Sequence, residues 1–144
     1  MVIADERSMD AQGVSSAEWA YRVLGPNNRI AGDRIQSVLM GSYGRQRVVQ
    51  RWSCGVNISG IFLAPELGRS ELEAVKRAQL RYLVVDRRIT RGPPLFGYYF
   101  ESWESMVVPF KPPPALAVLD KFDRMPGVSL IMDSGDIRVY YIGA

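Results

Sequence analysis

Histidine is absent from the 144 residues of this chain, and cysteine occurs once, at Cys54. A Ser-His-Asp triad and a Cys-His nucleophile pair both require histidine, and a Cys/His zinc site requires several such ligands. All three are therefore excluded from this chain. One cysteine also rules out an intramolecular disulfide, and a lone cysteine is most often a small buried hydrophobic residue.

Long hydrophobic runs are absent as well. No stretch approaches the roughly 18 consecutive apolar residues of a membrane-spanning helix. Residues 1–7 have neither the basic start nor the long apolar core of a secretory signal. We therefore expect the chain as given to be soluble. Residues 1–13 are polar and aperiodic, so we expect a flexible lead-in there and a single domain over residues 14–144.

Cofactor and nucleic-acid motifs are also missing. The segment from Gly41 to Gly44 lacks the lysine and the spacing of a phosphate-binding loop, and no G-x-G-x-x-G occurs. The net charge of +3 is a mild basic excess. The basic residues are spread over at least two loops and are not accompanied by a recognition helix or an RNA-binding signature. We predict no cofactor, no metal and no nucleic-acid partner.

An alternation of helix and strand patterns organises what is present. Residues 82–85 are four apolar residues between an amphipathic helix and a polar Asp-Arg-Arg, which is typical of a central strand buried on both faces. Shorter strand patterns occur at residues 29–33 and 47–50. Strands joined through helices favour a mostly parallel sheet with right-handed crossovers.

Local signals predict where the helices begin and end. Gly44 is placed to end one helix in a left-handed cap, and a fourth helix, with Leu116, Leu119 and Phe122 inward, follows the prolines at 112–114. Residues 52–63 are expected to form a loop leading to a short strand or turn, and residues 87–94 an irregular basic loop. Three capping boxes are expected, at Ser15 with Glu18, Asp33 with Gln36, and Ser70 with Glu73, the last with Leu72 inward.

The C-terminal residues predict a hairpin. Residues 128–132 and 137–142 are strand-like and are joined through a turn at 133–136. The complete pattern predicts an α/β fold. We expect a single three-layer Rossmann-like domain, with a mostly parallel sheet, about four flanking helices and this antiparallel β-hairpin at its C-terminal end.

Two aspartates occupy the positions where ligands usually bind in such a sheet. Asp33 and Asp86 each follow a predicted strand at its carboxyl end. With Arg34, Arg87 and Arg88 beside them, they are candidate ligands for a sugar hydroxyl, an amine or a phosphate. The alternative is structural: Asp33 caps its helix and Asp86 pairs with a neighbouring arginine.

Aromatic residues are concentrated in residues 95–103, which include Tyr99 and also carry Glu101. Such a segment either stacks on sugars or bases or, more commonly, packs the core shut. Glu101 and Glu104 are the obvious pair of acids for glycosidase-like chemistry. The segment is better interpreted as extended chain, which would point the two acids to opposite faces. We keep Tyr99 and Glu101 as candidate ligand contacts and predict no catalytic residue.

Six short motifs occur in order along the chain. They are NRIAGDR (28–34), GSYGRQ (41–46), YLVVDRR (82–88), GYYFE (97–101), LDKFD (119–123) and DSGDI (133–137). This series resembles the C-terminal soluble domain of large polytopic bacterial membrane proteins, of the glycosyltransferase-like class that uses polyprenyl-linked sugar donors. The resemblance spans roughly residues 15–142.

The resemblance implies a place for the domain in the cell. It implies an extracytoplasmic domain that follows a bundle of transmembrane helices, at the extracytoplasmic face of the bacterial cell membrane and as part of an integral membrane protein. In such transferases the catalytic acids lie in loops next to the membrane, so no catalytic residue transfers to this chain. The implied partner is the transmembrane portion of its own full-length protein, with a glycan or a lipid-linked sugar as a further candidate. Met1 would then be an added start of an excised domain.

Three functions follow from these patterns. The first is a non-catalytic extracytoplasmic accessory domain of a membrane glycosyltransferase-like protein, contacting a glycan, an acceptor or the membrane surface. The alternative is a free-standing α/β domain that binds a small sugar or phosphate, with Asp33, Asp86 and Arg87 lining the site. The least favoured is a carboxylate-dependent hydrolase that uses Glu101 and Glu104, whose activity would disappear in Glu101→Gln.

Overall fold

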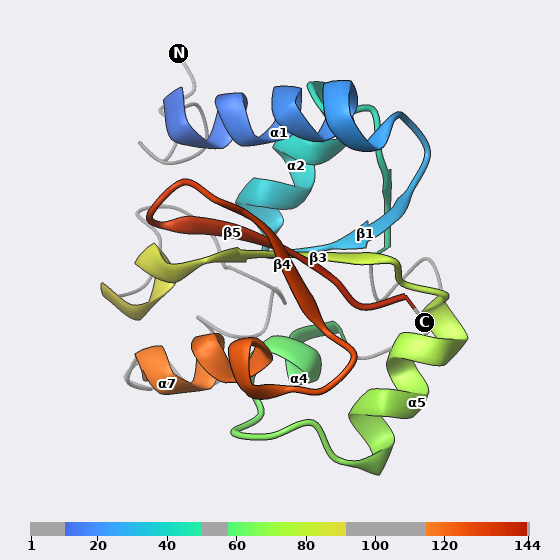
Figure 1. Ribbon diagram of the computed structural model, residues 1–144, viewed down its shortest axis with the longest axis vertical. Coiled ribbons are helices and arrows are strands. Elements are labelled where there is room, and N and C mark those ends of the chain that lie inside the picture. The colour runs from blue at the N-terminus through green and yellow to red at the C-terminus, as the bar shows by residue number, and fades with distance from the viewer. Residues whose placement is uncertain (1–10, 50–57, 92–114, 144) are drawn as a thin grey trace, which may run out of the picture.

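A computed structural model describes residues 11–49, 58–91 and 115–143 of the chain (Figure 1). It is an α/β fold with an open five-stranded sheet. The strands are β1 (Arg29–Ala31), β2 (Arg47–Val48), β3 (Tyr82–Asp86), β4 (Ser129–Asp133) and β5 (Ile137–Tyr141). The helices are α1 (Ala11–Leu24), α2 (Arg34–Ser42), α4 (Ile58–Leu63), α5 (Arg69–Ala78) and α7 (Leu116–Leu119), with the 3-10 turns η2 (Arg87–Arg91) and η3 (Asp120–Arg124).

The sheet is mixed. Its strand order is β2-β1-β3-β5-β4. β1 is parallel to both β2 and β3, whereas β5 is antiparallel to both β3 and β4. The prediction of a mostly parallel sheet was therefore wrong. Four strands, β1 to β4, run in the same direction and only β5 runs against them. Two of the four strand pairs are antiparallel, because the C-terminal hairpin places β5 between β3 and β4.

The predicted central strand and the predicted hairpin are both confirmed. β3 has a partner on each side, and its residues from Leu83 to Asp86 are buried. β4 and β5 pair in antiparallel register, with an irregularity between Leu130 and Met132. Figure 1 shows α1 and α2 over one face of the sheet and α4, α5 and α7 over the other. A strand with apolar layers on both faces has to be hydrophobic along its length, which accounts for the composition of β3.

None of the three capping boxes forms as predicted. At Asp33 only the N-cap half is present, because the Gln36 side chain donates to Asp86 and its Oε1 accepts no hydrogen bond. The other two boxes were misplaced. Ser15 lies inside α1, which already includes Ala11. α5 begins at Arg69 after an N-cap at Gly68, whose amide donates to Glu71 Oε2 at 3.0 Å. Because the sequence offers Glu71 and Glu73 two positions apart, two registers were possible. The helix uses the earlier register, with Gly68 as its N-cap and Glu71 as the third helical residue. It buries Ala74, Val75 and Ala78, whereas Leu72, predicted to point inward, is 45% exposed.

Three further segments differ from their predicted form. Ile58, Ile61 and Phe62 are buried at helical spacing, so the end of the expected loop is the helix α4. The start of the predicted basic loop is the 3-10 turn η2. The predicted fourth helix divides into α7 and η3, with Leu119 and Phe122 buried as expected but Leu116 42% exposed. Among the described helices, none is long and apolar enough to cross a membrane.

Gly44 has a different role from the predicted left-handed cap. The non-glycine residue that follows it, Arg45, has the positive φ angle of 51°, and Gly44 does not. A Cβ atom at Gly44 would lie 2.7 Å from the carbonyl oxygen of Met40 and 3.1 Å from that of Ala17. Glycine is required here because α1 and the end of α2 approach the backbone closely.

We therefore expect Gly44→Ala to lower the free energy of unfolding by about 1–3 kcal/mol, because the added methyl group has to displace backbone atoms. Gly41→Ala is the matched control. A Cβ at Gly41, inside α2, would make an ordinary contact of 3.6 Å with Val48 Cγ2, and alanine favours a helix interior by about 0.5–1 kcal/mol. Urea denaturation of both variants measures the difference; equal stability of the two would contradict this account.

Candidate functional site

The carboxyl ends of β1 and β3 form the topological switch point of the sheet. From β1 the chain passes through α2 to β2 on one side, whereas β3 lies on the other side of β1. α2 covers one face of the sheet, and α4 and α5 cover the other (Figure 1). Ligands of open α/β sheets bind where successive connections diverge in this way. Asp33 follows β1 and Asp86 ends β3, so the fold brings the two predicted aspartates to this point.

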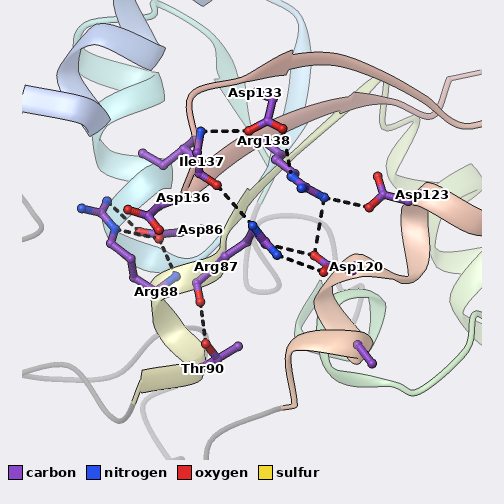
Figure 2. Close-up of polar contacts among 12 residues, drawn as sticks. Asp86, Arg87, Arg88, Thr90, Asp120, Asp123, Asp133, Asp136, Ile137 and Arg138 are labelled. Carbon is purple, nitrogen blue, oxygen red and sulfur yellow. Dashed lines mark hydrogen bonds and ion pairs between the residues drawn. The ribbon is translucent and has the colours of Figure 1, made fainter.

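Asp86 is 3% exposed, and its carboxylate is fully hydrogen-bonded. Oδ1 accepts from the backbone amide of Arg88 at 3.0 Å and from Arg88 Nε at 2.9 Å. Oδ2 accepts from Arg88 Nη2 at 3.0 Å and from Gln36 Nε2 at 3.1 Å. Figure 2 shows the guanidinium of Arg88 meeting this carboxylate side-on. Asp86 therefore pairs with a neighbouring arginine, as the structural interpretation predicted.

Asp33 is buried and caps α2. Its Oδ1 accepts from the backbone amide of Gln36 at 3.0 Å, and its backbone conformation is extended, as an N-cap requires. Gln36 therefore connects the two aspartates, with its backbone amide on Asp33 and its side-chain amide on Asp86. Arg34, the first residue of α2, is half-buried beside this point.

We expect Asp33→Ala to lower the free energy of unfolding by about 1 kcal/mol, because one amide at the start of α2 loses its acceptor. Asp33→Asn keeps an acceptor oxygen in the same place and should stay within a few tenths of a kcal/mol of the parent protein. Thermal denaturation of the two variants in parallel checks this prediction. A loss for Asn as large as that for Ala would show that the charge of Asp33, and not its capping oxygen, matters.

Arg87 and Arg88 point to different partners, although they are adjacent in the sequence. Arg87 forms a bidentate ion pair with Asp120, with Nε to Oδ1 at 3.1 Å and Nη2 to Oδ2 at 3.2 Å. Its backbone amide donates to the carbonyl oxygen of Asp136 at 2.7 Å. The tight 3-10 turn η2 separates successive side chains by about a third of a turn, which accounts for the divergence. The two arginines do not form one anion-binding face (Figure 2).

A second polar cluster lies around Arg138 on β5. Arg138 Nη1 is 2.7 Å from Asp123 Oδ2 and 3.6 Å from Asp120 Oδ1, and Nε is 3.4 Å from Asp133 Oδ2. The Tyr140 hydroxyl donates to Asp123 Oδ1 at 2.8 Å, and burial raises the pKa of Tyr140 to about 12. The hydrogen bond between Arg138 and Tyr140 holds the pKa of Arg138 above the ordinary arginine value.

Sequence reasoning did not identify this cluster as a unit. A signal was nevertheless present, because Arg87, the aspartates of η3 and Asp133 belong to three of the six short motifs quoted above. In the fold these three motifs meet around two arginines. The cluster joins η2, η3 and the hairpin, so its arrangement indicates a structural role.

Lys121 is the other functional candidate that the sequence did not reveal. It is 3% exposed, and its Nζ donates to the carbonyl oxygen of Phe62 at 2.6 Å and lies 4.8 Å from the centroid of the Phe122 ring. The described residues place no carboxylate within ion-pair distance of this ammonium. Burial lowers the pKa of Lys121 to about 8, and the Glu71 carboxylate opposes that shift. A lysine at this position in an amphipathic pattern gives no hint of burial.

The remaining candidates fall elsewhere. Tyr99, Glu101 and Glu104, with the rest of the aromatic segment 95–103, lie outside the described residues, as do Cys54 and residues 1–10. Within the described ranges, no group of three or more acidic residues or cysteines is placed to hold a metal ion. No protein-family model matches the chain, and no curated protein matches its sequence.

Proposed function

We propose that this chain is a non-catalytic extracytoplasmic accessory domain of a membrane glycosyltransferase-like protein. The series of six motifs suggests it, and one structural observation carries it. The charged side chains at the carboxyl end of β3 are bound to partners within the domain, Asp86 to Arg88 and Gln36, and Arg87 to Asp120.

The hydrogen bonds of the Asp86 carboxylate argue against a catalytic role for this residue. A general acid or base has to reach the proton that it transfers, and a nucleophile needs a free lone pair. Both oxygens of Asp86 already accept two hydrogen bonds each, and the group is buried. Asp33 uses one oxygen to cap α2. The residues that a sheet of this kind usually offers for chemistry serve here to hold the fold together.

The proposal includes the location and the contacts of the domain. It would lie at the extracytoplasmic face of a bacterial membrane, next to the transmembrane portion of its own full-length protein. A glycan, a lipid-linked sugar or the membrane surface would be its contacts. We also propose that the fold belongs to the three-layer Rossmann-like class, an assignment supported by helices on both faces of the sheet (Figure 1).

The native coding sequence tests this function. We expect it to continue upstream of Met1 in the same frame and to encode several apolar segments of about 20 residues each. Protease added to cells stripped of their outer layers should then digest this domain while a cytoplasmic marker stays intact. A native frame without hydrophobic segments, or a domain protected together with the marker, contradicts the proposal.

A free-standing domain that binds a small sugar or phosphate is the second candidate. The observation that favours it is the convergence of Asp33, Gln36 and Asp86 at the topological switch point. A thermal-shift screen of sugars, nucleotide sugars and phosphates tests it, because a ligand at 100 times its dissociation constant raises the free energy of unfolding by about 2.7 kcal/mol. The absence of a shift with every ligand contradicts this function.

A further inference from the structure

The side-chain oxygen of Gln36 is buried without a hydrogen-bond partner. Gln36 has no exposed area, and its Oε1 accepts no hydrogen bond. The orientation of the amide is determined by its neighbour, because Nε2 donates to Asp86 Oδ2. Reversing the amide would place Oε1 against a carboxylate oxygen, which repels it. A buried polar atom left unpaired costs about 1–3 kcal/mol, so this oxygen requires an explanation.

The unpaired oxygen lies at the point of the fold where ligands bind in such sheets. Gln36 belongs to the first turn of α2, directly after β1, and its amide group contacts the last residue of β3. The unpaired acceptor and the topological switch point are independent observations, since one comes from hydrogen bonding and the other from strand order. Their coincidence points to a ligand and not to a local defect of packing.

The charges around Gln36 select the kind of ligand. Asp86 and Arg88 neutralise each other in a bidentate pair. Asp33 and Arg34, which carry opposite charges, are adjacent at the start of α2, so the full charges at this point balance and select neither a cation nor an anion. An amide oxygen accepts from neutral and charged donors alike, and balanced surroundings favour a donor that carries no full charge. A neutral hydroxyl group is such a donor.

We propose that the β1–β3 switch point binds a neutral hydroxyl-bearing ligand of the sugar type, and that Gln36 Oε1 accepts a hydrogen bond from one of its hydroxyl groups. Arg34 and Arg88 are the partly exposed side chains at this point, so the ligand approaches beside them. The inference rests on the second function proposed above and names the ligand chemistry and the contact residue of that same site.

Titration of the native chain with neutral monosaccharides and with the matching sugar phosphates tests the inference, followed by backbone amide chemical shifts. We expect at least one neutral sugar to shift the amides of residues 32–36 and 86–88 in a saturable way, and its phosphate to bind no more tightly. The absence of shifts at these residues with every neutral sugar overturns the inference. So does tighter binding of the phosphates.

Two variants separate the role of Gln36 from that of the fold. Gln36→Met keeps the length of the side chain but removes the acceptor, and it should weaken sugar binding about tenfold, the effect of one hydrogen bond of about 1.4 kcal/mol. Ser37→Ala is the matched control, because it also removes a buried polar group from α2. In the native chain the Ser37 hydroxyl donates to the carbonyl oxygen of Gly32. Its affinity should stay within a factor of two or so of the parent value. Unchanged affinity in Gln36→Met overturns the inference, and if that variant does not fold, the amide shifts of the native chain decide.

The outcomes also separate this inference from the functions on which it bears. A ligand of another class that binds at other residues refutes the assignment of Gln36 but leaves a binding function intact. A high-resolution structure with a single internal water on Oε1, in a crystal grown with the sugar, refutes the inference as well, because one water satisfies a buried acceptor. The accessory-domain proposal depends on the upstream coding sequence and is untouched by either result.

Discussion

Replacing Lys121 with methionine is expected to stabilise the protein by about 2 kcal/mol at pH 7. The Lys121 ammonium is buried against the Phe122 ring with one hydrogen bond, to Phe62, and burial lowers its pKa from 10.5 to about 8. At 1.36 kcal/mol per pKa unit, keeping this group charged in the folded protein costs about 3 kcal/mol. Methionine has a similar length and no charge, and it loses only the hydrogen bond, which contributes about 1 kcal/mol.

The pH dependence gives this prediction its sign. Between pH 8 and pH 10.5 the unfolded chain holds the Lys121 proton and the folded protein releases it, so the free energy of unfolding rises with pH in that window. Below pH 8 both states are protonated and the penalty is constant, and above pH 10.5 it is gone. The advantage of Lys121→Met should therefore shrink as the pH rises from 8, vanish where the penalty equals the contribution of the lost hydrogen bond, and reverse by pH 10.5. Tyr140 ionises in the same way in the parent protein and in Lys121→Met, so its contribution cancels from the difference between their free energies of unfolding.

Urea denaturation of the two proteins across this pH range measures the effect. Lys76→Met is the matched control, since Lys76 lies on α5 and is exposed. Its stability should differ from that of the parent protein by less than about 0.5 kcal/mol at any pH. A Lys121→Met variant that is less stable than the parent at pH 7, or a difference that does not change with pH, would contradict the assignment of an unpaired buried ammonium.

Replacing Asp86 with alanine is expected to lower the free energy of unfolding by about 3–5 kcal/mol. The Arg88 guanidinium, whose side chain is 11% exposed, would lose both bonds of its bidentate pair with the buried carboxylate, and breaking a buried pair by removing one partner is strongly destabilising. The Gln36 amide would lose the acceptor of its Nε2, so both groups of its side-chain amide would then be unpaired. A chain of this size has a total stability of about 5–15 kcal/mol, so the variant is expected to lie near the limit of folding.

The double variant Asp86→Leu with Arg88→Met distinguishes the missing partner from the missing contacts. Removing both charges replaces the buried pair by apolar groups instead of leaving one of its members behind, so most of the loss should be recovered. Glu73→Gln provides a control for an ordinary ion pair. The Arg69–Glu73 pair is 93% and 63% exposed, and its loss should cost less than about 0.5 kcal/mol. A loss in Asp86→Ala no greater than that of Glu73→Gln would show that the buried pair contributes nothing.

The features that the sequence determined by itself are local ones. The apolar run of β3 required burial on both faces, the Asp33 spacing placed an N-cap whose carboxylate accepts from the Gln36 amide, and Gly135 with its neighbours produced the hairpin. Each depends on residues close together in the chain, where steric limits and hydrogen bonds act without help from the rest of the fold. Where two local solutions were available, as with Glu71 and Glu73, the pattern did not choose between them.

Only the tertiary structure decided which of these residues meet. The position of β5 beside β3 made the sheet mixed, and it brought Arg87 to Asp120 while Arg88 stayed with Asp86. Residues 36 and 86 are far apart in the sequence, so no spacing rule links the Gln36 amide to the Asp86 carboxylate. The burial of Lys121 depends equally on the packing of η3 against α4. Contacts of this kind follow from how separate elements bury their apolar faces together, and a one-dimensional pattern contains only the tendency of each element to be buried.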